Sequence, residues 1–208
     1  IQGNMQTMHD AIVTNGKFSS GDSVFIQGAS SGVGLMGLKI AKALGASLTI
    51  GSSTSEQRRS RLKEFGADIV IDTSSADWLK TLLDVTDGKG VDILIDMLSG
   101  DYVNKNMEAT KINGHLINIG RLAGMNGNFD YDLHAKRRLN YIGTTGRTRS
   151  IDENEEVANL ANKDLWNLVL DGKIRHHIDK VFPLEGAKDA LEIMNKNNHF
   201  GKLVLLVN

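Results

Sequence analysis

A cluster of glycine, alanine and serine residues is the stretch of the sequence best suited to chemistry. Residues 28–34 read Gly-Ala-Ser-Ser-Gly-Val-Gly and follow an apolar run at residues 24–26. Apolar residues then recur at helical spacing, at Val33, Leu38, Ala41 and Leu44. This pattern predicts a strand, a tight turn and a helix. Because small residues let a ligand approach the backbone, and the helix start carries positive dipole charge, the stretch favours a phosphate site.

Two classes of enzyme use a turn of this kind. The dinucleotide fingerprint Gly-x-Gly-x-x-Gly aligns with residues 29–34, where only its third glycine, Gly34, is kept. The same stretch also satisfies Gly-x-Ser-x-Gly, the nucleophile elbow of serine hydrolases, with Ser30 as the nucleophile. Very little chain precedes this elbow and no HGGG-like oxyanion loop is present, so a hydrolase is the second interpretation.

Composition narrows the classes of protein further. The 208 residues are 40% apolar and 24% charged, which is ordinary for a globular protein. The net charge of −1 argues against a general nucleic-acid binder, and the lack of a signal peptide or long apolar span predicts a cytoplasmic protein without a membrane partner. The absence of cysteine excludes disulfides, thiolate nucleophiles and cysteine-ligated zinc. Because the chain begins at Ile1 without an initiator methionine, we expect a fragment.

Strands and helices alternate along most of the sequence. Strands are predicted at residues 24–26, 46–50, 69–71, 91–95, 115–119 and 139–144. This order implies right-handed crossovers and a doubly wound parallel sheet, the α/β fold of Rossmann-type nucleotide-binding domains, over residues 1–150. Residues 151–208 predict a further segment with helices at 153–171 and 187–195 and strands at 174–182 and 203–207.

The ends of the predicted strands locate the site. In this fold ligands bind beyond the carboxyl ends of the strands, where Ser30, Ser52, Thr73, Leu98 and Gly120 are expected to converge on one crevice. Enzymes that prefer the unphosphorylated nicotinamide cofactor usually place an acidic residue after the second strand.

The residues that follow the second strand carry hydroxyl groups instead. Residues 51–54 read Gly-Ser-Ser-Thr, and Arg58 and Arg59 lie one helical turn further on. A guanidinium forms charge-assisted hydrogen bonds with phosphate, so this pattern favours the 2′-phosphate of NADPH.

Five short segments carry a family resemblance. They are the glycine-rich turn at 28–34, Leu44-Gly45-Ala46, Phe65-Gly66-Ala67-Asp68, Gly90-Val91-Asp92-Ile93 and Gly201-Lys202-Leu203-Val204-Leu205. In this order and at about this spacing they resemble the medium-chain dehydrogenase/reductase superfamily, and within it the zinc-free, NADPH-dependent quinone oxidoreductases. The resemblance covers essentially the whole chain. It implies an N-terminal catalytic domain that this chain lacks, onto which the last strands fold back and leave apolar surface exposed here.

The resemblance also implies the residues that contact the cofactor. They are Ser31, Gly32 and Val33 at the pyrophosphate, Ser53 and Arg58 at the 2′-phosphate, Thr73 near the adenosine, Leu98, Gly120 and Arg121 beside the ribose and nicotinamide, Thr7 near the nicotinamide, and Lys202 near the phosphates. Ser31 stands where the family commonly has glycine. The cysteine that binds zinc in zinc-dependent relatives is absent near residues 3–6, so no metal is expected.

The resemblance implies hydride transfer from NADPH to a quinone or an α,β-unsaturated carbonyl, and a homodimer joined through the edge strand at 139–144. No residue of this chain is a convincing general acid, so the catalytic residues are unknown and the isolated chain is expected to be inactive. A non-catalytic NADPH-binding module is the remaining alternative. The Tyr-x-x-x-Lys pair of short-chain reductases is absent.

Overall fold

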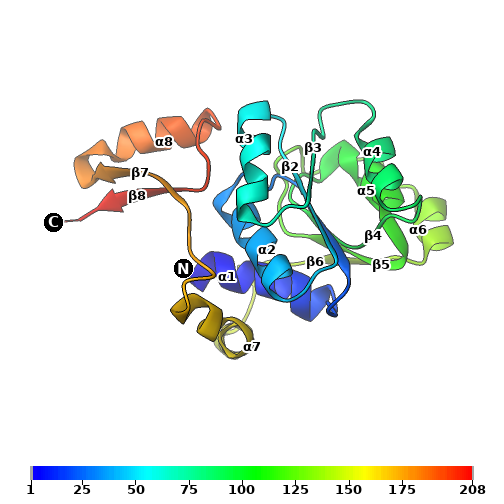
Figure 1. Cartoon of the computed structure of the whole chain (residues 1–208), viewed down its shortest axis with the longest axis horizontal. Helices are drawn as coiled ribbons and strands as arrows, with labels where there is room; N and C mark the ends of the chain where they lie inside the picture. Colours follow the sequence, from blue (N-terminus) through cyan, green and yellow to red (C-terminus); the bar gives the residue numbers. More distant parts are fainter. Residues whose placement is uncertain (1, 208) are drawn as a thin grey trace.

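Six parallel strands form the central sheet of the computed structural model, which describes residues 2–207 (Figure 1). The strands lie in the order β3-β2-β1-β4-β5-β6. Their bounds are Ser23–Ile26 (β1), Leu48–Ser52 (β2), Ile69–Ile71 (β3), Val91–Asp96 (β4), Thr110–Asn118 (β5) and Asn140–Gly143 (β6). The order reverses between β1 and β4, and every neighbouring pair is parallel. The predicted doubly wound Rossmann-type α/β fold is therefore confirmed.

Helices cover both faces of this sheet. They are α1 (Gln2–His9), its π-helical continuation η1 (Asp10–Asn15), α2 (Gly32–Ala43), α3 (Glu56–Arg61) with η2 (Leu62–Phe65), α4 (Trp78–Val85), η3 (Gly100–Tyr102), α5 (Val103–Ala109), α6 (Tyr131–Arg137) and α7 (Ile151–Leu170). Because successive side chains of a strand point to opposite faces, Val24 and Ile26 join the core under α1, α2 and α7, whereas Phe25 joins the core under α4 and α5.

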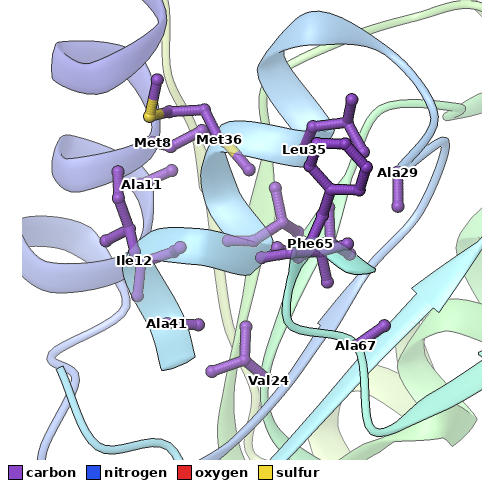
Figure 2. Close-up of a cluster of buried hydrophobic side chains, with 14 of the residues drawn as sticks. Met8, Ala11, Ile12, Val24, Ala29, Leu35, Met36, Ala41, Phe65 and Ala67 are labelled. Atoms are coloured by element: carbon purple, nitrogen blue, oxygen red, sulfur yellow. The ribbon is translucent and has the colours of Figure 1, made fainter. Parts of the chain in front are cut away.

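The contact between α1 and α2 is tight, and a glycine makes it possible. Figure 2 shows Met8 and Met36 facing each other between these helices. A Cβ atom added at Gly37 would lie 2.0 Å from the Met8 Cε and 2.8 Å from the Ile26 Cδ1. Met8 and Ile26 are fully buried. Gly37 therefore lets α1 approach α2 closely, and this packing fixes the start of α2 relative to the sheet.

The chain ends in a smaller unit beside α3 (Figure 1). It consists of β7 (Ile178–Pro183), η4 (Leu184–Gly186), α8 (Ala187–Asn195) and β8 (Lys202–Leu206), and its two strands are parallel. Many of its large apolar side chains are exposed, namely Ile178, Val181, Leu184, Leu191, Met194, Leu205, Leu206 and Val207. Such clustered exposure is typical of a surface that packs against another part of a protein.

Some elements differ from the predicted bounds. β2 lies two residues later than predicted, and β7 begins at Ile178 rather than at residue 174. β5 begins at Thr110, because the Asn113-Gly114 pair forms an irregularity within the strand instead of a turn before it. The predicted division of the chain at residue 150 stays a prediction. Within residues 2–207, no helix has both the length and the hydropathy needed to cross a membrane.

Candidate cofactor site at the carboxyl edge of the sheet

The turn between β1 and α2 has the geometry of a close-fitting backbone loop. Ser31 is the N-cap of α2, and its Oγ accepts a hydrogen bond from the Gly34 N–H at 3.0 Å. A Cβ at Gly34 would lie 2.5 Å from the Ala29 Cα, so only glycine fits there. This explains why Gly34 is the one fingerprint glycine that the sequence keeps, since it serves helix–strand packing.

The start of α2 is covered by the segment that leads into β8. The Gly201 N–H donates to the Ser30 carbonyl at 3.2 Å. A Cβ at Gly32 would lie 3.1 Å from the Lys202 Cδ and Cε, so the Lys202 side chain crosses the first turn of the helix. The Val33 N–H in that turn has no acceptor within the helix. A helix start with a lysine stem beside it fits a pyrophosphate.

A cavity of about 260 Å³ opens where β1, β2, β3 and β4 end, and we call it the Arg58 cavity. Its lining consists of Gly28, Ser30, Ser31, Ser52, Ser53, Thr54, Arg58, Thr73, Leu98, Tyr102, Leu122, Ala123, Asn197 and His199. The lining contains five serine or threonine hydroxyls from the first two strand ends and no carboxylate. Its charge therefore suits an anionic ligand.

The two arginines after β2 have different surroundings. Arg59 donates to the Ser53 carbonyl at 2.8 Å and forms an ion pair with Asp72 at 3.0 Å, so its charge is compensated. The Arg58 Nη1 instead donates to the Asn197 carbonyl, to the Asn197 Oδ1 at 3.1 Å and to the His199 carbonyl at 3.4 Å. Arg58 is in no ion pair with a carboxylate of residues 2–207. Of the two, only Arg58 offers an uncompensated charge to the cavity.

Asn197 and His199 enter this cavity from the loop between α8 and β8, and sequence reasoning did not identify them. Asn197 has a φ of 51°, in the left-handed region that asparagine tolerates better than most residues. The Nδ1 of His199 is buried without a hydrogen-bond partner among the described residues. Burial lowers the pKa of His199, and the nearby charge of Arg58 lowers it further.

A second cavity, of about 510 Å³, lies where β5 and β6 end, and we call it the Arg121 cavity. Its lining comes from α1, from the residues after β5 and β6, and from the first turns of α7: Gly3, Gln6, Thr7, Asp10, Ile119, Arg121, Thr144, Thr145, Gly146, Arg147, Arg149, Asn154 and Val157. One loop borders both cavities, because Arg121 lines this one and the next two residues line the Arg58 cavity.

A buried polar network supports that loop. The Asp96 Oδ1, at the end of β4, accepts the backbone N–H groups of Leu98 and Ser99 at 2.8 Å each. The Asn118 amide donates to the Ser99 Oγ at 2.5 Å, and the Ser99 hydroxyl donates to the Gly120 carbonyl at 2.8 Å. Burial raises the pKa of Asp96, whereas these backbone N–H groups lower it. The network therefore holds Leu98 and Gly120 at fixed positions, a role that no local sequence pattern indicates.

The predicted contact residues fall into three places. Ser31, Ser53, Arg58, Thr73 and Leu98 line the Arg58 cavity, Thr7 and Arg121 line the Arg121 cavity, and Gly32, Val33 and Lys202 lie at the start of α2. Gly120 lines neither cavity and lies against the Met97 backbone. Their roles toward a cofactor stay predictions.

The surroundings of Ser30 do not resemble those of a hydrolase nucleophile. Its Oγ accepts a hydrogen bond from the Ser53 hydroxyl at 3.3 Å. The partner of its hydroxyl is thus another serine hydroxyl. A nucleophilic serine requires a base within hydrogen-bonding reach, so the geometry gives the hydrolase interpretation no support.

Comparisons with known proteins agree with this architecture. Residues 32–163 match the family model described as zinc-binding dehydrogenase. A mycocerosic acid synthase-like polyketide synthase of Mycolicibacterium smegmatis is 27% identical over 198 residues, which is 91% of this chain and 9% of that protein. An NAD-dependent alcohol dehydrogenase structure matches with a TM-score of 0.83 and 26% identity, over 100% of this chain and 57% of its own. The structure of mycobacterial Rv1454c complexed with NADPH matches in fold, with a TM-score of 0.86, 20% identity and coverage of 100% and 63%.

The chain thus spans less than two thirds of each of these proteins. The family model is named for zinc, but the part of the chain that the structure describes holds no group of three or more His, Cys, Asp or Glu side chains able to bind a metal ion. These residues therefore do not fit a zinc site. The matched residues, together with the fold, show that this chain belongs to the zinc-binding dehydrogenase family of the medium-chain dehydrogenase/reductase superfamily.

Proposed function

We propose that this chain is the NADPH-binding part of an oxidoreductase that transfers a hydride to a quinone or an α,β-unsaturated carbonyl. The observation that carries the proposal is the lining of the Arg58 cavity, which has an arginine without a carboxylate partner and no acidic residue among residues 52–54 at the end of β2. An acidic residue there would bind the ribose hydroxyls of NADH and repel a 2′-phosphate. The hydroxyls of Ser53 and Thr54 can instead donate to phosphate oxygens.

Arg58 retains hydrogen-bond donors for such a ligand. A guanidinium has five N–H donors in a planar fork. All three of the protein acceptors around Arg58 bond to Nη1, so Nε and Nη2 are the nitrogens left for an anion. Two adjacent N–H donors suit the bidentate geometry of a phosphate.

The remaining predicted residues would extend the site along the sheet edge. The start of α2, with Lys202 beside it, would hold the pyrophosphate, and the Arg121 cavity would take the nicotinamide end. Bound NADPH would supply the hydride, and the protein would orient the nicotinamide and exclude water from it. This chain spans only part of the length of its relatives. The identity of the hydride acceptor is therefore proposed from the resemblance to quinone oxidoreductases alone.

Titration with NADPH and with NADH, followed by nicotinamide fluorescence, tests the cofactor assignment. We expect NADPH to bind more tightly, and Arg58→Ala to weaken NADPH binding by about 1.5–3 kcal/mol, or roughly tenfold to a hundredfold, without changing NADH binding. Lys63→Ala removes an exposed charge near the same helix and serves as the control. Equal affinities for the two nucleotides, or an unchanged NADPH affinity in Arg58→Ala, would contradict the proposal.

A further inference from the structure

The charges around the Arg121 cavity are unbalanced. Three arginines line it, Arg121, Arg147 and Arg149, against one carboxylate, Asp10. Asp10 is buried and forms an ion pair with Arg149, so these two charges compensate each other. Within residues 2–207, neither Arg121 nor Arg147 is in an ion pair. Two positive charges therefore remain at the cavity without a partner.

The rest of the lining is polar and adds neutral hydrogen-bonding groups. Side-chain hydroxyls come from Thr7, Thr144 and Thr145, and amides come from Gln6 and Asn154. Arginine forks match the planar oxygens of a carboxylate or a phosphate, and a concave site concentrates their field. The lining thus combines the groups that recognise an oxyanion.

The position of this cavity separates it from the phosphates of the cofactor. Under the proposed function, the 2′-phosphate belongs to the Arg58 cavity at the ends of β2 and β3, and the pyrophosphate belongs to the start of α2. The Arg121 cavity lies on the other side of the loop that carries Arg121, at the ends of β5 and β6. An anion bound there would belong to the molecule that receives the hydride.

We infer that the Arg121 cavity binds a carboxylate or phosphate group of an anionic hydride acceptor, held by Arg121 and Arg147. That the bound molecule is the hydride acceptor rests on the proposed function. The anion site itself does not depend on it. Asp10 acts as a positioning residue, because its ion pair fixes Arg149 at the wall of the cavity. Arg149 is not the residue to test, since its removal would leave Asp10 buried without a partner.

Pairs of probes that differ in charge test the inference by calorimetric titration at fixed ionic strength. Monomethyl fumarate is compared with dimethyl fumarate for the carboxylate, and phenyl phosphate is compared with phenol for the phosphate. We expect the charged member of at least one pair to bind about tenfold more tightly than its neutral counterpart, as a charge-assisted hydrogen bond would produce. The pair with the larger preference identifies the group.

Arg121→Gln and Arg147→Gln should each remove most of this preference, whereas Lys105→Gln, which removes an exposed charge from α5, should leave it unchanged. Thermal unfolding of each variant establishes that it is folded. Equal binding within both pairs, or a preference that survives in both arginine variants, would overturn the inference. Each titration is run with and without NADP⁺, so a failure to bind nucleotide counts against the proposed function alone.

Discussion

Arg58 donates a hydrogen bond to the backbone carbonyl of Asn197, a residue 139 positions further along the chain. The contact joins the helix after β2 to the loop before β8, across one wall of the Arg58 cavity. Because the same Nη1 also meets the His199 carbonyl, the C-terminal loop fixes the direction of the guanidinium. Arg58, which the sequence predicts as a phosphate contact, is therefore oriented by the 197–199 loop, and the sequence did not predict this contact.

The first prediction concerns Asn197, whose left-handed φ places its carbonyl toward Arg58. Asn197→Val strains this backbone, because a β-branched residue disfavours positive φ. We expect NADPH affinity to fall by about 1 kcal/mol, or roughly fivefold, with NADH affinity unchanged. Asn197→Gly keeps the backbone conformation and should lose less. Equal losses for both nucleotides would show that the loop does not act through Arg58.

The second prediction concerns the stability of the fold at mildly acidic pH. Burial lowers the pKa of His115, His177 and His199, and nearby Lys17, Arg61 and Arg58, respectively, lower it further. The unfolded chain then binds protons at a higher pH than the folded chain does, since an unperturbed histidine titrates near about 6.5. Stability is therefore complete above this value and is lost as the pH falls below it. We expect the Tm to decrease between pH 7.5 and 5.5.

His177 offers a direct control for this pH dependence. Its ring makes edge contacts with Phe65 and Phe200, with centroids 5.1 and 5.3 Å away. His177→Phe keeps an aromatic ring there and removes the titrating group, so it should reduce the slope of Tm against pH. His134→Gln, on α6, controls for the loss of a histidine elsewhere. A slope that is the same in His177→Phe and in the unchanged chain would contradict the assignment.

Local sequence patterns determine much of this fold. β3 and α8 begin and end at the predicted residues, because β-branched runs and helical apolar spacing are bounded there by turn residues. The prediction at Asn113-Gly114 was wrong. This dipeptide is typical of a turn, but β5 pairs with β4 on both sides of it, so it forms an irregularity within the strand. The short helix α6, capped by the Asp130 side chain, was not predicted.

Part of the candidate site could likewise be predicted from the sequence, and part of it depends on tertiary packing. Ser30, Ser52, Thr73 and Leu98 could be predicted to converge, because parallel strands bring their carboxyl ends to one edge. The contacts of Arg58 with the 197–199 loop depend on how the C-terminal unit packs beside α3, which no local pattern reports. The Asp96 network is likewise tertiary, since it joins the ends of β4 and β5.

The third prediction concerns Gly37, at the contact between α1 and α2. Gly37→Ala places a methyl group within 2.0 Å of the Met8 Cε, so the helices must separate or Met8 must move. Overpacking of this kind costs about 1–3 kcal/mol, and we expect that loss in the free energy of unfolding measured with denaturant. Gly3→Ala in α1, where a Cβ has no neighbour within 4 Å, should cause no loss. Equal free energies of unfolding for the two variants would mean that the contact between α1 and α2 accommodates the added methyl group without loss of stability.

The last prediction concerns the exposed edge of β6. This strand ends the sheet, Asn140 and Gly143 are exposed, and Tyr141 is 37% exposed. Unpaired backbone groups of an edge strand favour pairing with another copy, so we propose a homodimer through residues 139–144. Sedimentation equilibrium should report a dimer, and Asn140→Lys should shift it toward monomer because charge on an edge opposes pairing.

Asn140 is a better position for this substitution than Ile142, whose side chain packs partly against the core. Asn195→Lys adds the same charge on α8 and should leave the dimer intact. A monomer at every concentration of the unchanged chain would refute the pairing.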